Sequence, residues 1–382
     1  MDCPYIPIIS YGELSQRLHG KIAGQRVPIT GSIEVTARCN LRCVHCYINL
    51  PASDQSALQR ELSCQEWFHV LDQIVDEGCL WLLLTGGEPF VRPDFLEIYT
   101  YAKKKGVLVT IFTNGTTITP SLADHLAEWP PFAIEITLYG RTQPTYERVT
   151  GIPGSYERCV RGIKLLLERQ LPLKLKSMVL TLNAHEIWAV KEFADELGVD
   201  FRFDPVLNVR VDGDRQPAEF RIAPEKVVAL DLADDKRLKS WHEFCEQFVG
   251  PSPEPEYLYH CGAGLRTFHV DPYGQLSTCM MARVPGYDLS RGTFHEGWYT
   301  FLRRARAQRR KRNTSCQHCE LIALCGQCPG WAQMEHGDPE TPVEYLCKIA
   351  HLRAKAFGLQ PAKPKEVNAR TNTDRADQTT VL

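Results

Sequence analysis

Three cysteines in the first part of the chain have the spacing of a metal centre. They are Cys39, Cys43 and Cys46, a C-x3-C-x2-C triplet that directly follows a β-rich segment. Three thiolates can hold three irons of a 4Fe-4S cluster, so the fourth iron keeps an open site for an external ligand. A reactive cluster requires such a site. The triplet alone also leaves open a zinc site completed by a residue such as His45.

A glycine-rich turn follows the next β-rich segment. Its sequence is Thr85-Gly86-Gly87-Glu88-Pro89. Glycines lack a Cβ, so the backbone here could approach a ligand closely, although an ordinary turn from a strand to a helix would have the same composition. Loops after parallel strands are where α/β folds place their chemistry. Both motifs occupy such positions.

Seven further cysteines lie in the last third of the chain. They are Cys261, Cys279, Cys316, Cys319, Cys325, Cys328 and Cys347. Read alone, the two C-x2-C pairs among them could form a zinc knuckle. The total of 15 cysteines is odd and the chain has no secretory signal, which argues for metal ligation and against a disulfide framework. Cys3, Cys64, Cys79 and Cys159 are interpreted as ordinary thiols.

The segments that must position these motifs alternate between β-rich runs and amphipathic helical patterns. Strands are expected at 32–36, 80–84, 107–113, 133–138, 173–180 and 200–207. Helices are expected at 63–78, 94–105, 121–129, 155–170 and 185–197. Six βα units imply a parallel sheet with helices outside, and they are too few for a closed eight-stranded barrel. The prediction is an α/β fold with a partial (βα)6 TIM-type barrel.

The pattern divides the chain into five parts. They are an N-terminal extension (1–31), the partial barrel (32–207), a bridging region (208–260), the cysteine-rich domain (261–359) and a polar tail (360–382). The cysteine-rich domain is expected to be held together by metal more than by a large core. The tail has almost no apolar residues, so we expect it to be disordered.

Composition limits the partners. The chain has 382 residues, a formal net charge of −2 and 43% hydrophobic residues, which gives no overall electrostatic case for nucleic-acid binding. The basic run Arg303–Arg312 is interpreted as a solvated helix face rather than a nucleic-acid patch. The longest apolar stretch, Cys79–Leu84, is far shorter than the ~18 residues of a membrane span. We therefore expect a cytoplasmic protein.

The two N-terminal motifs together resemble the radical S-adenosylmethionine (SAM) superfamily. Cys39–Tyr47 matches its cluster loop and Thr85–Pro89 its GGEP motif, within a resemblance that covers Ser32–Leu207. The resemblance implies that Cys39, Cys43 and Cys46 hold a 4Fe-4S cluster whose open iron binds SAM. Reductive cleavage of SAM would give a deoxyadenosyl radical that abstracts hydrogen, in a site that the protein shields from quenchers.

The resemblance also implies a set of SAM contacts. Gly86, Gly87, Glu88 and Pro89 are expected at the methionine end of SAM, with Asn114, Thr137 and Arg148 as further contacts. The sequence departs from the family at Tyr139, where many relatives have Asp.

The C-terminal cysteines resemble a SPASM domain, which carries two auxiliary iron–sulfur clusters. Family topology would assign Cys316, Cys319, Cys325 and Cys347 to one fully ligated cluster. Cys261, Cys279 and Cys328 would serve the other, with Cys245, water, another side chain or the substrate as the fourth ligand. The last C-x2-C is one residue tighter than the common family spacing.

Size and layout most resemble the pyrroloquinoline-quinone, mycofactocin and sactipeptide maturases. They imply an oxidoreductase that cross-links or decarboxylates a ribosomally made precursor peptide and takes electrons from a donor such as flavodoxin or ferredoxin. Alternatives are a tetrapyrrole enzyme of the haem pathway, a sulfatase-type maturase, which Met280 disfavours, and a non-catalytic metal-binding scaffold. Only thirty-one residues precede Ser32, so a separate leader-binding protein is expected to present the peptide.

Overall fold

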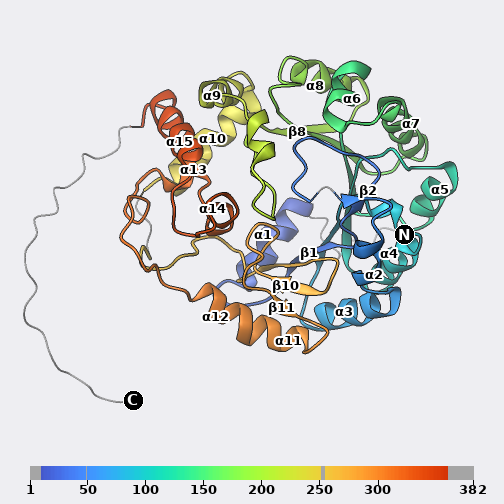
Figure 1. The fold of residues 1–382 in the computed structure, drawn as a ribbon, viewed down its shortest axis with the longest axis horizontal. Coiled ribbons are helices and arrows are strands. Elements are labelled where there is room, and N and C mark those ends of the chain that lie inside the picture. Colours follow the sequence, from blue (N-terminus) through green and yellow to red (C-terminus); the bar gives the residue numbers. More distant parts are fainter. Residues whose placement is uncertain (1–9, 49, 251–253, 360–382) are drawn as a thin grey trace, which may run out of the picture.

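The computed structural model describes residues 10–48, 50–250 and 254–359. Within them one sheet of nine strands forms the centre of the molecule, in the order β11-β10-β9-β1-β4-β5-β6-β7-β8 (Figure 1). Its strands are β1 (Thr30–Glu34), β4 (Trp81–Thr85), β5 (Leu108–Thr113), β6 (Ala133–Thr137), β7 (Leu173–Met178), β8 (Asp200–Asp204), β9 (Thr267–Val270), β10 (Gln275–Ser277) and β11 (Tyr287–Asp288). Neighbours from β9 to β8 pair in parallel, whereas β10 and β11 run antiparallel.

The six predicted strands correspond to β1 and β4 to β8, and the predicted α/β partial barrel is confirmed. The last two strands are shorter than predicted. β7 ends at Met178 and β8 at Asp204 because Leu180 and Leu207 leave the sheet and pack with Val149 in a separate apolar cluster. In both cases the apolar residues continue past the last hydrogen-bonded residue of the strand, so the predicted strand is too long.

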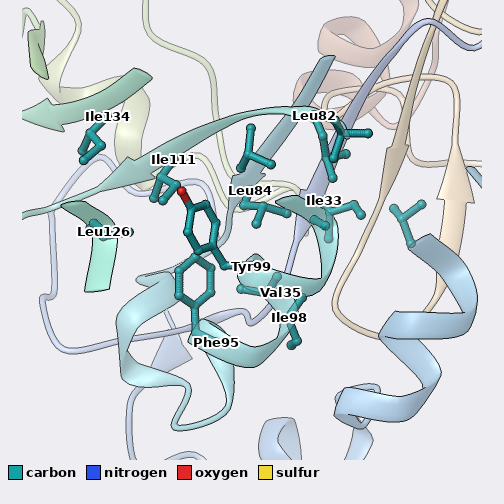
Figure 2. Close-up of a cluster of buried hydrophobic side chains, with 14 of the residues drawn as sticks. Ile33, Val35, Leu82, Leu84, Phe95, Ile98, Tyr99, Ile111, Leu126 and Ile134 are labelled. Carbon is teal, nitrogen blue, oxygen red and sulfur yellow. The ribbon is translucent and has the colours of Figure 1, made fainter. Parts of the chain in front are cut away.

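The five predicted helices lie outside the sheet (Figure 1). They are α3 (Cys64–Asp76), α4 (Phe95–Lys104), α5 (Pro120–Glu128), α7 (Ser155–Glu168) and α8 (Ile187–Glu196). The predicted capping box is present, since Ser63 and Glu66 exchange hydrogen bonds at the start of α3. Figure 2 shows the core between these helices and the strands, where Phe95 and Tyr99 of α4 meet Ile111 and Leu84.

Several short elements have no counterpart among the predictions. They are α1 (Tyr11–Lys21), β2 (Arg38–Cys39), β3 (Leu50–Pro51), α2 (Gln55–Arg60), the 3-10 turn η1 (Pro89–Val91) and α6 (Gln143–Thr150). The polar, eight-residue α6 buries only Thr145, Tyr146, Val149 and Thr150, too few positions for a clear helical period.

The C-terminal part continues the barrel sheet. β9 pairs with β1, and Phe268 and Val270 join the same apolar core as Ile33. Residue 261 therefore marks no break in the sheet. The remaining elements are η2 (Gln216–Phe220), α9 (Pro224–Leu232), α10 (Asp235–Phe248), α11 (Phe294–Glu296), the π-helical segment η3 (Gly297–Leu302), α12 (Arg303–Arg306), α13 (Ile322–Cys325), α14 (Pro329–His336) and α15 (Glu344–Ala356).

Leu321, Leu324, Val343 and Leu346 of the cysteine-rich part are buried in a small second core, which also includes Cys245 of α10. The predicted disordered tail, 360–382, lies outside the described residues. No helix within the described ranges has the length and hydropathy needed to cross a membrane.

Candidate active site

The cysteine triplet follows the C-terminal end of β1: Cys39 ends the two-residue strand β2, and Cys43 and Cys46 lie in the loop after it. Cys43 is buried, whereas Cys39 and Cys46 are half-buried. Burial raises the pKa of the Cys39 thiol to about 12, and the nearby Glu88 and Cys46 act in the same direction. Burial, Cys46 and Cys39 likewise raise the pKa of Cys43. The three thiols thus lie near enough to disfavour one another's thiolate forms.

Backbone hydrogen bonds hold this loop in place. The amides of Arg42 and Val44 donate to the carbonyls of Thr150 and Val149 at the end of α6, over 2.9 and 3.0 Å. Leu41 is 1% exposed, and its amide donates to the Cys39 sulfur over 3.4 Å. The unpredicted helix α6 is therefore the support on which the cysteine loop rests.

The glycine turn after β4 packs directly on the chain that leads into the cysteine loop. A Cβ on Gly86 would lie 2.2 Å from the Thr36 carbonyl oxygen, and one on Gly87 would lie 2.3 Å from that of Arg38. The amides of Gly87 and Glu88 donate to these same two oxygens, over 2.8 and 2.9 Å. The close approach that the glycines allow is therefore to backbone, and it joins the two motifs.

Glu88 extends this connection to the next strand. Its buried carboxylate accepts hydrogen bonds from the Thr113 hydroxyl and the Asn114 amide, each over 2.7 Å. Burial raises the pKa of Glu88 to about 7, although these hydrogen bonds favour the charged form. The Asn114 side chain donates to the Asn40 side chain over 2.9 Å and contacts the Cys39 sulfur at 3.7 Å.

The other predicted SAM contacts are more dispersed. Pro89 is buried at the start of η1, and Thr137 is half-buried at the end of β6. Arg148 is exposed on α6 and donates to the Leu182 carbonyl over 3.0 Å. The structure describes no contact between Arg148 and the three thiols, and these SAM contacts stay predictions.

Tyr139 is a site residue that the sequence marked only as a departure. Burial raises the pKa of its phenol well above the usual value, as do the neighbouring Cys43, Cys46 and Cys39, and its hydroxyl is hydrogen-bonded to Cys43. The ring of His45 lies against it, with the ring centres 4.8 Å apart. Burial lowers the pKa of His45 to about 4, so this imidazole is neutral. Thr116, which accepts from Asn40 over 2.8 Å, was also missed.

The C-terminal thiols form two neighbourhoods. Burial raises the pKa of Cys325 to about 12, and the neighbouring thiols of Cys347, Cys316 and Cys319 act in the same direction. Burial likewise raises the pKa of Cys328 to about 11, with Cys279 and Cys261 as neighbouring thiols. The assignment of these thiols to two ligand sets stays a prediction.

Cys245 is one of the candidates for the fourth ligand beside Cys261, Cys279 and Cys328. It packs in the apolar cluster of Leu321, Leu324 and Cys325. No three His, Cys, Asp or Glu side chains in the described part of the chain converge tightly enough to hold one metal ion. The first cysteine loop and the two C-terminal neighbourhoods all offer thiols, and thiolates are the usual ligands of iron–sulfur clusters.

Two cavities lie beside the C-terminal thiols. One, of about 430 Å³, is bounded by residues 211–213, 281–284 and 329–337, next in sequence to Cys279 and Cys328. The amide of Val211 donates to the Tyr47 carbonyl over 3.0 Å, which ties one wall to the cysteine loop. The second, of about 540 Å³, is lined in part by Cys261, Cys316 and Cys328.

A family model and two relatives of known function match parts of this chain. The model of the radical SAM superfamily matches residues 33–194. The AdoMet-dependent heme synthase of Methanosarcina barkeri is 36% identical over 177 residues, which are 46% of this chain and 50% of that protein. The mycofactocin maturase MftC of Mycobacterium ulcerans is 29% identical over 285 residues, 72% of this chain and 75% of that protein.

Among solved structures, SuiB of Streptococcus suis bound to the precursor peptide SuiA superimposes with a TM-score of 0.66 at 17% sequence identity, covering 91% of this chain and 83% of SuiB. At this level of identity the likeness concerns the fold. It extends through the cysteine-rich part as well as the barrel.

Proposed function

Because residues 33–194 form a radical SAM domain, we propose that the protein is a radical SAM oxidoreductase that modifies a ribosomally made peptide. One observation carries the proposal. The loop of Cys39, Cys43 and Cys46 and the turn of Gly86–Pro89 are joined through backbone hydrogen bonds at adjacent strand ends.

Cys39, Cys43 and Cys46 would hold the catalytic 4Fe-4S cluster. When bound, the cluster and SAM supply a deoxyadenosyl radical for hydrogen abstraction. The protein orients the loop through Gly86, Gly87 and Glu88. Asn114 and Tyr139 contact the cysteines directly and would adjust the surroundings of the cluster through their polar hydrogens.

The two neighbourhoods of C-terminal thiols support two auxiliary iron–sulfur clusters. Cys316, Cys319, Cys325 and Cys347 would ligate one of them. Cys261, Cys279 and Cys328 would ligate the other, and a fourth donor would come from outside these three thiols. A cluster contributes its binding free energy to the stability of the surrounding chain, which matches the small apolar core of this part.

Extent of similarity supports a peptide as the substrate. The match to mycofactocin maturase covers 72% of this chain, which is more than the barrel alone, and the fold of peptide-bound SuiB covers 91% of it. A separate leader-binding protein, an electron donor such as flavodoxin or ferredoxin, and a cytoplasmic location remain predictions.

A tetrapyrrole is the second candidate substrate, favoured by one observation. The heme synthase has the higher identity of the two relatives, although its match spans only half of that protein's length. A shared barrel accounts for a match of this extent without a shared substrate.

Turnover distinguishes the two substrate classes. The anaerobically reconstituted protein is incubated with SAM, a low-potential reductant and either the precursor peptide encoded beside its gene or an iron coproporphyrin. We expect the peptide to lose hydrogen or carbon dioxide, as seen by mass spectrometry. Turnover of the porphyrin with an unchanged peptide would reject the peptide assignment.

Addition of any small leader-binding protein encoded nearby should raise peptide turnover, because it increases the effective concentration of the core segment.

A further inference from the structure

A buried carboxylate on β1 connects two parts of the chain that are far apart in sequence. Glu34 is 0% exposed. It accepts a two-pronged pair of hydrogen bonds from the Arg283 guanidinium, over 2.9 and 2.6 Å. The hydroxyl of Tyr47 donates to the same carboxylate over 2.8 Å.

Each of the two donors, Tyr47 and Arg283, lies in a loop beside a predicted cluster ligand. Tyr47 directly follows Cys46, and Arg283 lies four residues after Cys279. The Arg283 side chain also donates to the Met280 carbonyl over 2.8 Å, so it braces the loop from which it comes. One carboxylate therefore joins the first cysteine loop to the loop after Cys279.

Arg283 supplies the positive charge at this junction. The nearby His269 ring lies 3.8 Å from the Glu34 carboxylate, but burial lowers its pKa to about 4, so it is neutral at pH 7. A paired guanidinium fixes both distance and orientation, because its planar fork matches the carboxylate. Such a buried pair adds little net stability relative to apolar residues, and its main effect is on geometry.

We propose that Glu34 and Arg283 fix the position of the first cysteine loop relative to the loop after Cys279. Arg283 is thereby a positioning residue, which couples SAM cleavage to peptide modification. The inference rests on the proposed function. It assigns a task to residues outside the SAM contacts and the cysteine ligands.

The chain offers a matched control in Arg237. This side chain donates to the buried Asp231 over 2.7 Å and to the Phe203 carbonyl over 3.1 Å. The side-chain exposure is 24% for Arg237 and 0% for Asp231, against 19% for Arg283 and 0% for Glu34. Arg283→Lys and Arg237→Lys therefore each remove a guanidinium paired with a buried carboxylate at similar depth. Arg237 gives Asp231 one hydrogen bond instead of two, and only Arg283 touches the two loops.

The first test is hydrogen exchange on the full-length, anaerobically purified chain, which needs no turnover. We expect Arg283→Lys to speed exchange about tenfold in both 40–48 and 279–284. Arg237→Lys should speed exchange only around residues 203 and 231. Unchanged exchange in 40–48 of Arg283→Lys, or an equal change there in Arg237→Lys, would refute a fixed relative position of the two loops.

The second test is the amount of deoxyadenosine formed per modified peptide. Arg283→Lys should raise this ratio about tenfold, since small displacements of reacting groups reduce product strongly, whereas Arg237→Lys should match the wild type. The double variant Glu34→Gln/Arg283→Met carries no unpaired charge but lacks the fork, and we expect the same raised ratio. A wild-type ratio in the double variant would overturn the inference. Absence of deoxyadenosine from the wild type would instead overturn the proposed function.

Discussion

The thiols of the first cysteine loop lie in surroundings that disfavour the thiolate. Burial raises the pKa of Cys39 to about 12, and the Glu88 carboxylate acts in the same direction. Ligation by iron requires the deprotonated thiol, so cluster binding must release these protons. The hydrogen bonds from the Leu41 amide and the Asn114 side chain lower the pKa of Cys39 and prepare this sulfur for ligation.

A prediction at this scale concerns His269, which lies between Glu34, Arg283 and Ser32. Burial lowers its pKa from 6.5 to about 4. The unfolded chain therefore binds a proton at higher pH than the folded chain does. The stability contributed by this group is complete above pH 6.5 and is lost as the pH falls toward 4, by up to about 3 kcal/mol.

We expect His269→Gln to flatten the pH dependence of stability between pH 6.5 and 4. The measurement is urea unfolding of wild type and variant across that range, taken as the difference between the two so that other acidic groups cancel. His185, which is exposed, supplies the control variant His185→Gln. Parallel curves for wild type and His269→Gln would show that the buried imidazole does not cause the slope.

At the scale of elements, the site is built where the glycine turn rests on the chain leading into the cysteine loop. A Gly87→Ala methyl group would meet backbone, 2.3 Å from the Arg38 carbonyl oxygen, so relief requires a backbone shift. We expect a loss of about 1–3 kcal/mol in the free energy of unfolding, as for other overpacked positions. Denaturant unfolding of the full chain measures this.

Gly20→Ala is the control for this substitution. Gly20 lies in α1 with nothing within 4 Å of its added Cβ, so alanine should stabilise by about 0.5–1 kcal/mol. If Gly87→Ala is as stable as the wild type, the two motifs are not held together as described.

Elements with strong periodicity could be predicted from the sequence, and weakly patterned ones could not. Strands β4 and β5 are short, almost continuous apolar runs, and helix α3 has one buried apolar stripe at helical spacing. Helix α6 is short and polar, yet it anchors the cysteine loop through Val149 and Thr150. Strand β9 has four residues, and its place beside β1 depends on pairing between segments more than 230 residues apart.

For the molecule as a whole, the predicted grouping of the C-terminal thiols rests on family resemblance and not on spacing. Cys328 lies three residues after Cys325 in the chain, yet it neighbours Cys261 and Cys279. The connection between Glu34 and Arg283 could not be predicted either, since it joins residues 249 positions apart. Charged residues in a β-strand and a loop have no local pattern that would indicate burial together.

The likeness to peptide maturases over most of the chain, together with the three groups of thiols, supports the proposal of an enzyme with three cluster sites. Each group is expected to hold one 4Fe-4S cluster, or about twelve irons per chain. Of the three groups, the first cysteine loop is the one joined to the glycine turn Gly86–Pro89. We therefore expect SAM to be cleaved there.

The most direct test replaces Cys39, Cys43 and Cys46 together by Ala, reconstitutes the variant anaerobically, and measures iron and deoxyadenosine in the presence of SAM and reductant. The variant should lose about four irons, keep those of the auxiliary groups, and form no deoxyadenosine. Deoxyadenosine formation by the triple variant at the wild-type rate would contradict the account.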